Sequence, residues 1–273
     1  MGKLVWLASY PKSGNTWVRA FLHNYITNAQ TPHSINHLTD ASVSECALAF
    51  FGTPGQIISP TEAQALRPHV HQKLTRLHED LVFVKTHNAN LTVHDTPLCT
   101  PEVTAGAIYI VRDPRDVALS YAAFTGKSVD EIIAFMANEG AANASDGVQV
   151  FELLSSWSRH AVSWVAAPRR LLVRYEDLQA DPERGFARII RFLGTANDKP
   201  DPERLQRAIS FSHFSTLAAQ EIKEGYRAGG PSGERFFRAG KTEQWRKGLS
   251  KAQAEAIWTA HHEIMEKFGY KNV

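Results

Sequence analysis

Four groups of cationic, hydroxyl-bearing and imidazole side chains each follow directly on a short apolar run of the sequence. The groups are Ser9–Trp17, Lys85–His87, Arg112–Ser120 and Arg174–Asp177. Lysine and arginine beside hydroxyl donors suit the binding of a phosphate-like anion, and a histidine can accept a proton near neutral pH. If the four groups meet in the fold, they predict a site that binds an anion and moves a proton.

The first group predicts an anion site. A strand, a short loop with Gly14 and a helix would place free backbone N–H groups and a positive helix end at one spot. Lys12 adds a point charge there, and Ser13, Asn15 and Thr16 add donors. Because lysine precedes Ser-Gly, the segment lacks the Gly-Lys-Ser/Thr order of the nucleoside triphosphate P-loop, and a magnesium site is not supported. An ordinary strand–helix turn with a surface lysine is the alternative.

The other groups have plainer alternatives when each is taken alone. Arg112, with Ser120 on the following helix, suits bidentate phosphate contact, but the same charges could form a solvated salt-bridge cluster. His87 beside Lys85 could be a base or a packed histidine. The stretch Arg238–Lys241 is basic and contains glycine, and it is weak by itself. The histidine pairs elsewhere lack cysteine or carboxylate partners at ligand spacing, so no metal site is predicted.

The apolar runs before these groups are typical of strands buried on both faces. They are rich in Val, Ile and Leu without clean alternation, as in a parallel sheet: Leu4–Ala8, Leu81–Val84, Ala107–Val111 and Leu171–Val173. Apolar residues at helical spacing predict helices over 17–26, 148–165, 182–193 and 251–268. Strands alternating with helices predict an α/β fold with a mostly parallel central sheet flanked by helices. Such sheets bind ligands at the carboxyl ends of their strands.

Three further segments show no clear period. Residues 31–80 and 122–147 are expected to be insertions over the ligand-binding edge of the sheet. Gly225–Gly240 holds five glycines and is expected to be a mobile loop. No repeat or linker divides the chain, so a single domain over residues 1–273 is expected.

Composition narrows the class of protein. Of 273 residues, 43% are hydrophobic and 21% charged, which fits one folded domain. Lys and Arg total 30 and Asp and Glu total 28, a balance that favours neither a nucleic-acid nor a membrane partner. The two cysteines lack metal or redox spacing, and no signal peptide or membrane-length apolar run is found. These features predict a cytoplasmic protein.

Taken together and in order, the polar groups resemble the motifs of the sulfotransferases that use 3′-phosphoadenosine-5′-phosphosulfate (PAPS), of the cytosolic and bacterial small-molecule type. Asn15 replaces a common Thr of the first motif, and Ala239, Glu243 and Gln244 replace the usual Lys, Gly and Asp of the last. The matching segments are residues 9–17 (5′-phosphosulfate motif), 85–87 (catalytic Lys-x-His), 108–121 (3′-phosphate motif), 174–178 (adenine-contacting element) and 236–245 (closing loop).

The resemblance implies in-line transfer of a sulfuryl group from PAPS to an acceptor hydroxyl of a small molecule, with an amine as the less favoured acceptor. The product is 3′-phosphoadenosine-5′-phosphate (PAP), and no metal is implied. The implied catalytic residues are Lys12 at the leaving phosphate oxygen, Lys85 at the sulfuryl group, His87 as general base, and Ser120. The implied nucleotide contacts are Lys12, Ser13, Gly14, Asn15 and Thr16 for the 5′-phosphate, Arg112, Ser120, Arg238, Ala239 and Gly240 for the 3′-phosphate, and Trp17, Tyr175, Ser212 and Phe214 for the adenine.

Two other classes stay open at the level of sequence. A P-loop-type kinase would use ATP and Mg²⁺ at the same edge of the sheet, and a non-catalytic nucleotide-binding protein would keep the fold without the chemistry. The acceptor is not identified by the sequence, and residues 31–80 and 122–150 are expected to form its pocket. Whether the protein is a homodimer also stays open.

Overall fold

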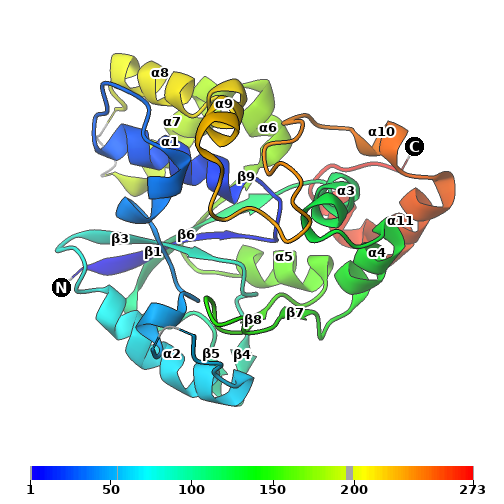
Figure 1. The fold of residues 1–273 in the computed structure, drawn as a ribbon, viewed down its shortest axis with the longest axis horizontal. Coiled ribbons are helices and arrows are strands. Elements are labelled where there is room, and N and C mark those ends of the chain that lie inside the picture. The colour runs from blue at the N-terminus through cyan, green and yellow to red at the C-terminus, as the bar shows by residue number, and fades with distance from the viewer. Residues whose placement is uncertain (1, 54, 195–198, 273) are drawn as a thin grey trace.

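The computed structural model describes residues 2–53, 55–194 and 199–272 (Figure 1). A five-stranded sheet forms its centre, and all neighbouring strands in it run parallel. This confirms the expected α/β fold, and the four apolar runs of the sequence are its long strands. In spatial order the strands are β2 (Val43–Ser44), β3 (Leu81–Thr86), β1 (Lys3–Ser9), β6 (Thr104–Val111) and β9 (Arg170–Arg174).

Strand β1 is the middle strand, and its side chains alternate between two cores. Trp6 and Ala8 belong to the cluster on one face, while Val5 and Leu7 belong to the cluster on the other. A strand covered on both faces needs apolar residues at every position, which explains the unbroken apolar run. Because the neighbouring strands are parallel, the polar groups that follow β1, β3, β6 and β9 all leave the sheet at one edge.

Helices cover both faces of the sheet (Figure 1). The core of Val5 and Leu7 is closed by α1 (Asn15–Ile26), α6 (Tyr175–Ala180), α7 (Pro182–Leu193) and α8 (Pro202–Phe211). The core of Trp6 and Ala8 is closed by α2 (Pro60–Leu74), α3 (Pro114–Thr125), α4 (Val129–Ala137), α5 (Trp157–Val165) and α11 (Lys251–Lys267).

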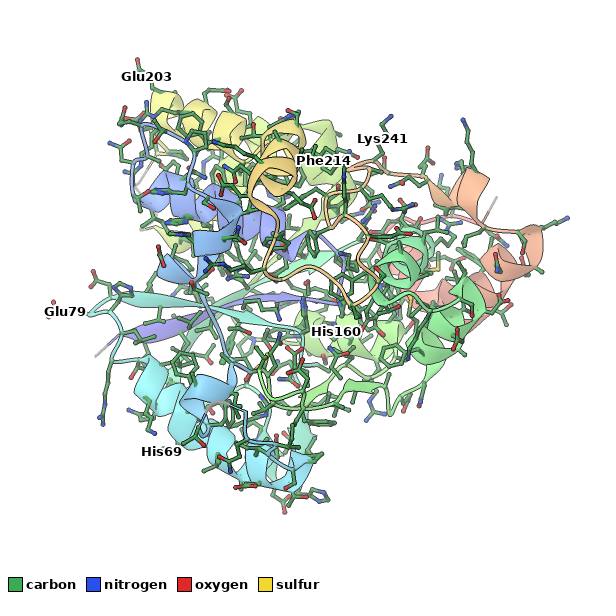
Figure 2. The ribbon with its side chains drawn as sticks, in the orientation of Figure 1. His69, Glu79, His160, Glu203, Phe214 and Lys241 are labelled. Atoms are coloured by element: carbon green, nitrogen blue, oxygen red, sulfur yellow. The ribbon has the colours of Figure 1, made fainter. Side chains whose placement is uncertain are left out.

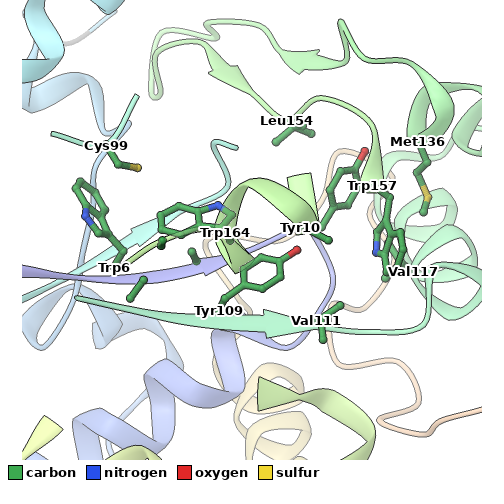
Figure 3. Packing of buried hydrophobic residues seen from close by; sticks show 14 of the residues in the cluster. Trp6, Tyr10, Cys99, Tyr109, Val111, Val117, Met136, Leu154, Trp157 and Trp164 are labelled. Carbon is green, nitrogen blue, oxygen red and sulfur yellow. The ribbon is translucent and has the colours of Figure 1, made fainter. Parts of the chain in front are cut away.

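Several large aromatic side chains pack in the core that contains Trp6 and Ala8 (Figure 3). Tyr109 of β6 stacks on Trp164 of α5, with ring centroids 6.3 Å apart, and its hydroxyl meets Nδ1 of His160 at 3.0 Å. The remaining elements are helix α9 (Phe214–Glu224) and several short pieces: η1 (Ile35–Asp40), η2 (Leu48–Phe50), β4 (Thr92–Val93), β5 (Thr96–Pro97), η3 (Pro101–Val103), β7 (Ala142–Asn143), β8 (Glu152–Leu153) and α10 (Trp245–Gly248).

The helix expected over residues 148–165 is wrong in its first half. Only α5, from Trp157, is helical, and β8 pairs with β7 in an antiparallel hairpin before it. Ser155 has a φ of 61°, a left-handed conformation that a continuing helix cannot contain. Ser156 then caps α5 by accepting a hydrogen bond from the Arg159 N–H. The spacing of the apolar residues suits both arrangements, so the period misleads here.

The expected insertions contain helices that the sequence analysis missed. Segment 31–80 contributes β2, which pairs with the carboxyl end of β3, and the 15-residue helix α2, which keeps Pro68 inside it. Segment 122–147 contributes α4, which starts with a capping box between Ser128 and Glu131. That Ser-x-x-Glu pattern was visible in the sequence. Over Gly225–Gly240 the chain forms neither helix nor strand.

The last two expected helices are confirmed. Helix α7 ends before Gly194, and α11 starts with the expected capping box of Ser250 and Gln253. Gly269 follows α11 with a φ of 78°, which glycine adopts without steric cost. Among the described residues, no helix has the length and apolar character needed to span a bilayer.

Candidate active site

The turn between β1 and α1 forms an anion cradle. Gly14 caps α1 with a φ of 106° and lies so near Tyr175 that a Cβ atom would sit 2.7 Å from the tyrosine ring. No side chain caps the helix, so its first N–H groups remain available. In the described part of the chain, the buried hydroxyl of Ser13 has no hydrogen-bond partner. Buried unpartnered donors at a helix start fit a bound phosphate.

Two of the predicted phosphate donors already have protein partners. The Asn15 amide donates to the Leu7 carbonyl at 2.8 Å and to the Ser9 hydroxyl at 3.4 Å, so its side chain ties the turn to β1. The Thr16 hydroxyl bonds with the phenol of Tyr226. For these two residues the backbone N–H groups, and not the side chains, are the groups that the structure leaves for an anion.

Lys12 lies between aromatic rings. Its ammonium is 3.5 Å from the ring centroid of Phe236 and 4.4 Å from that of Phe124. Burial is the main cause that lowers the pKa of Lys12 to about 7, and the nearby Arg112 lowers it further. The residue itself has a φ of 65°. A lysine with this pKa is only about half protonated near pH 7.

Arg112 links the cradle to the loop before α10. Its guanidinium donates to the Lys12 carbonyl at 3.1 Å and to the Lys241 carbonyl at 3.0 Å. It lies over the Tyr175 ring at 4.4 Å and faces the Asp116 carboxylate at 3.9 Å. Its Nε–H is buried and, in the part of the chain that is described, has no acceptor. An arginine fixed in this way still has a donor to offer to an anion.

The residues expected around the adenine form two contacts. Trp17 packs edge-on against Tyr175, with centroids 5.7 Å apart. Phe214 packs on Gly240, whose φ is 58° and where a Cβ atom would lie 2.2 Å from the ring. Figure 2 shows Phe214 near Lys241, at the start of α9. The loop can pass this close to Phe214 only because residue 240 is glycine.

The remaining residues predicted to contact the nucleotide are Ser212, Arg238, Ala239 and Ser120. Ser212 is fully buried, and its hydroxyl donates to the Ala208 carbonyl of its own helix at 2.9 Å. Arg238 is exposed, yet near enough to contribute to the lowered pKa of Lys12. Ala239 and Ser120 are half-buried, and Ser120 lies on α3, the helix that follows Arg112.

His87 is held in one tautomer at the end of β3. Its Nδ1 lies 2.7 Å from the backbone carbonyl of Ser9, which can only accept, so Nδ1 carries the proton and Nε2 keeps its lone pair. The Nε2 of His160 lies 3.1 Å from the His87 carbonyl. Burial first, and Lys85 second, lower the pKa of His87 to about 4. The imidazole is therefore neutral at pH 7, as a proton acceptor must be.

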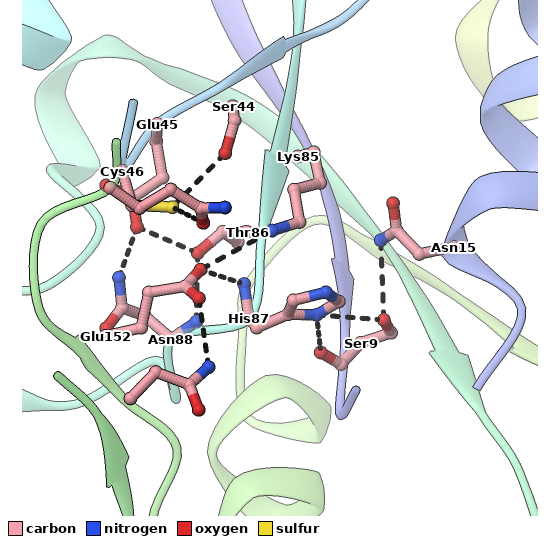
Figure 4. Close-up of polar contacts among 12 residues, drawn as sticks. Ser9, Asn15, Ser44, Glu45, Cys46, Lys85, Thr86, His87, Asn88 and Glu152 are labelled. Atoms are coloured by element: carbon pink, nitrogen blue, oxygen red, sulfur yellow. Dashed lines mark hydrogen bonds and ion pairs between the residues drawn. The ribbon is translucent and has the colours of Figure 1, made fainter. Parts of the chain in front are cut away.

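Two buried carboxylates were missed by the sequence analysis (Figure 4). Glu152 lies 3.7 Å from the ammonium of Lys85. Glu45 accepts from Arg67 at 2.5 Å and from the hydroxyl of Thr86, which lies between Lys85 and His87, at 3.1 Å. Each is a single acidic residue in a mainly apolar stretch, which was a signal for a buried charge. The predicted residues of the β1, β3, β6 and β9 ends thus meet, with two carboxylates behind them.

The chain is similar to known proteins over nearly its whole length. The family model of the sulfotransferase domain matches residues 3–269. Cytosolic sulfotransferase 5 of Arabidopsis thaliana is 23% identical, over 97% of this chain and 80% of that protein. Sulfotransferase 1A1 of Bos taurus is 24% identical, over 94% and 81%.

Solved structures share the fold. Retinol dehydratase in complex with retinol and PAP has a TM-score of 0.63 at 17% identity, covering 99% of this chain and 83% of that one. A mouse sulfotransferase complexed with PAP has a TM-score of 0.61 at 17% identity, covering 97% and 84%. These likenesses extend over nearly the whole chain and so include every strand that carries a site residue.

Proposed function

The chain belongs to the sulfotransferase family, and we propose that the residues at the carboxyl edge of its sheet transfer a sulfuryl group from PAPS to the hydroxyl of a small-molecule acceptor. One observation carries the assignment of roles. A neutral His87 is bonded to Ser9, the last residue of the strand that leads into the anion cradle of Lys12 and Ser13. Proton acceptor and anion site are therefore joined at one strand end. Membership of the sulfotransferase family counts against the alternative of a kinase that uses ATP and Mg²⁺.

In the proposed reaction the acceptor oxygen attacks sulfur while the bond from sulfur to the 5′-phosphate oxygen breaks. Nε2 of His87 takes the acceptor proton, and PAP leaves with the bonding electron pair. Lys12 and the first N–H groups of α1 stabilise the charge on the leaving phosphate, and Lys85 offsets charge on the sulfuryl oxygens. Reactions of this type depend on positioning and electrostatics, which fixed donors supply.

The proposed nucleotide site uses the groups around Arg112. The unpartnered Nε–H of Arg112 and the hydroxyl of Ser120 take the 3′-phosphate, while Arg238, Ala239 and Gly240 close over it. The adenine lies between Trp17 and Phe214 beside Tyr175. Ser212 supports the adenine site from within its helix, because its hydroxyl already donates a hydrogen bond to the Ala208 carbonyl.

The acceptor is proposed to be a small molecule. The solved retinol dehydratase complexes hold retinol or androsterone, both small alcohols. In this chain the segments at the matching edge are residues 31–80 and 122–150, which contribute the apolar rings of Phe50, Phe51, Phe124 and Phe135 to the core cluster. A hydroxyl acceptor fits a neutral histidine base, because an alcohol must lose its proton as the bond to sulfur forms.

The first test is nucleotide binding by calorimetry without added magnesium. PAP should bind at least about tenfold more tightly than adenosine 5′-phosphate, which lacks only the 3′-phosphate; this corresponds to about 1.4 kcal/mol. ADP with and without magnesium serves as the comparison for a kinase-type site. Equal affinity for PAP and adenosine 5′-phosphate, or binding that requires magnesium, would contradict the proposal.

Exchange of Arg112 for alanine tests the 3′-phosphate contact. PAP affinity should fall by at least about tenfold, because a charge-assisted contact to phosphate is lost, while affinity for adenosine 5′-phosphate changes much less. Arg246, an exposed arginine paired with Glu243, provides the matched control variant Arg246→Ala. Equal weakening of both ligands would assign Arg112 to the turn that it tethers through Lys12, and not to the 3′-phosphate.

A further inference from the structure

One carboxylate oxygen contacts both members of the Lys-x-His pair (Figure 4). Oε1 of Glu152 accepts a hydrogen bond from the backbone N–H of His87 at 3.2 Å and lies 3.7 Å from the Lys85 ammonium. The side chains of Glu152 and Lys85 are only 3% and 14% exposed. Since Lys85 and His87 are two residues apart in the chain, a single acceptor between them fixes their relative position.

Other side chains hold Glu152 in place. Its second oxygen accepts from the Asn143 amide at 3.3 Å, and the Asn143 carbonyl oxygen lies 3.1 Å from the Tyr121 hydroxyl, which donates to it. Asn143 and Glu152 are register partners in the β7–β8 hairpin. The carboxylate therefore has a fixed direction, which a surface glutamate would not have. A buried charge with both oxygens engaged is a built feature of the fold.

We infer that Glu152 is a positioning residue for sulfuryl transfer: it keeps the Lys85 ammonium charged and directed at the site, and it holds His87 in place through the backbone. The inference rests on the proposed function of the Lys-x-His pair. Glu152 contacts neither the anion cradle nor Arg112 in these bonds, so nucleotide binding does not depend on it.

The charge balance around the pair supports this role. Burial is the largest influence on Lys85 and would lower its pKa, but Glu152, followed by Cys46 and Glu45, together raise it. Burial is the largest influence on Glu152 and would raise its pKa, but Lys85, then His87 and the hydrogen bonds from Cys46 and Asn143, together lower it to about 2. The other groups that act on Lys85 are Cys46, Arg19 and Glu45. Arg19 opposes the Lys85 charge and Cys46 and Glu45 favour it. Glu152 is the carboxylate that forms an ion pair with Lys85 in the described part of the chain.

The test starts with the titration of Lys85 in protein labelled with ¹³C at lysine Cε, where Lys85→Arg identifies the signal. In Glu152→Gln the Lys85 midpoint should fall below the ordinary lysine value of about 10.4, by more than about one pH unit, because a buried ammonium loses its counter-charge. Unfolding alone would place it at the ordinary value. Glu139→Gln, which removes an exposed carboxylate paired with Arg159, is the matched control.

The second readout is the single-turnover breakdown of PAPS to PAP and sulfate, with water as acceptor and excess protein. The water oxygen attacks sulfur, the bond to phosphate breaks, and His87 takes the proton. Glu152→Gln should slow this rate by about tenfold or more at pH 7.5, which is part of the roughly 100-fold or more that a positioned acid–base group contributes. Glu152→Asp should recover part of both the rate and the Lys85 midpoint. PAP affinity should stay within about twofold of wild type in each variant.

An unchanged Lys85 midpoint with an unchanged rate in Glu152→Gln would overturn the inference. Should this variant not fold, Glu152→Asp carries the same measurement. Its shorter side chain withdraws the carboxylate from both nitrogens, so the Lys85 midpoint and the rate should both fall, and no change in either would also overturn it. Failure of wild-type protein to bind PAP would contradict the proposed function instead, and the Lys85 titration would still decide the role of Glu152.

Discussion

Replacing His87 with alanine should lower kcat by at least about 100-fold at a saturating acceptor concentration, the usual weight of a general base. The structure gives the reason: Nδ1 donates to the Ser9 carbonyl, so the lone pair of Nε2 is the group that can take a proton. Because the pKa of His87 is lowered to about 4, the base is unprotonated above about pH 5. The wild-type rate should therefore be nearly independent of His87 protonation from pH 8 down to that point.

The control for this variant is His69→Ala, which removes an exposed histidine of α2. It should leave kcat unchanged. PAP affinity of His87→Ala, measured by calorimetry, should stay close to that of wild type, since the hydrogen bonds of His87 involve Ser9, Glu152 and His160 and not the cradle of Lys12 and Ser13. A variant without His87 that keeps a near-normal kcat would show that another group accepts the proton.

The affinity for PAP should fall as pH rises above 7, by up to about 100-fold between pH 7 and pH 9. In the free protein the pKa of Lys12 is lowered to about 7, chiefly by burial. Beside a phosphate the ammonium is favoured, so the pKa in the complex is higher. Above pH 7 the protein must then take up a proton to bind PAP, which costs up to about tenfold in affinity for each pH unit.

Calorimetry in two buffers of different ionisation enthalpy measures this proton directly. Uptake should approach one proton per PAP near pH 8. PAP itself contributes little there, because the second ionisation of a phosphate lies near pH 6. Lys12→Arg provides the control, since a guanidinium stays charged throughout the range and should flatten the dependence. A flat profile in the wild type would mean that Lys12 is already fully charged in the free protein.

The aromatic contacts of Lys12 set part of this behaviour. An ammonium over an aromatic ring gains about 0.5–2 kcal/mol depending on its exposure to water. Phe236 belongs to the loop after α9 and Phe124 to α3, so binding of an anion has to compete with rings from two elements. Phe236→Ala removes a ring that buries Lys12, and because burial is the main cause of its lowered pKa, that pKa should rise in the free protein and the pH dependence should become shallower.

The sequence predicted the parts of the site that follow strands. Ser9, Lys85, Arg112 and Tyr175 each come directly at or after the end of an apolar run, and strand ends in a parallel sheet must meet at one edge. Chain order and residue type were sufficient for this, without any knowledge of distances. The strand order in the structure then decided which groups are neighbours.

The sequence could not predict groups whose role depends on contacts between distant segments. Glu152 lies on a two-residue strand that exists only because it pairs with Asn143. The same apolar spacing also suited a helix, and the left-handed Ser155 that breaks the helix has no composition signal. Glu45 owes its burial to Arg67, 22 positions along the chain. The period of the apolar residues shows which face of a helix or strand is buried, but it does not show which distant segment buries that face.

The β7–β8 hairpin has a consequence for attempts to redesign this protein. Segment 122–150, proposed to shape the acceptor pocket, runs directly into β8, where Glu152 contacts the reacting pair. Grafting the pocket of a relative onto this chain would exchange Asn143, and with it the support of Glu152, unless the hairpin register is kept. One short segment of the chain therefore affects both the selectivity for the acceptor and the rate of sulfuryl transfer. A library that varies the pocket while keeping Asn143 and Glu152 fixed is expected to retain more active members than one that varies all of them.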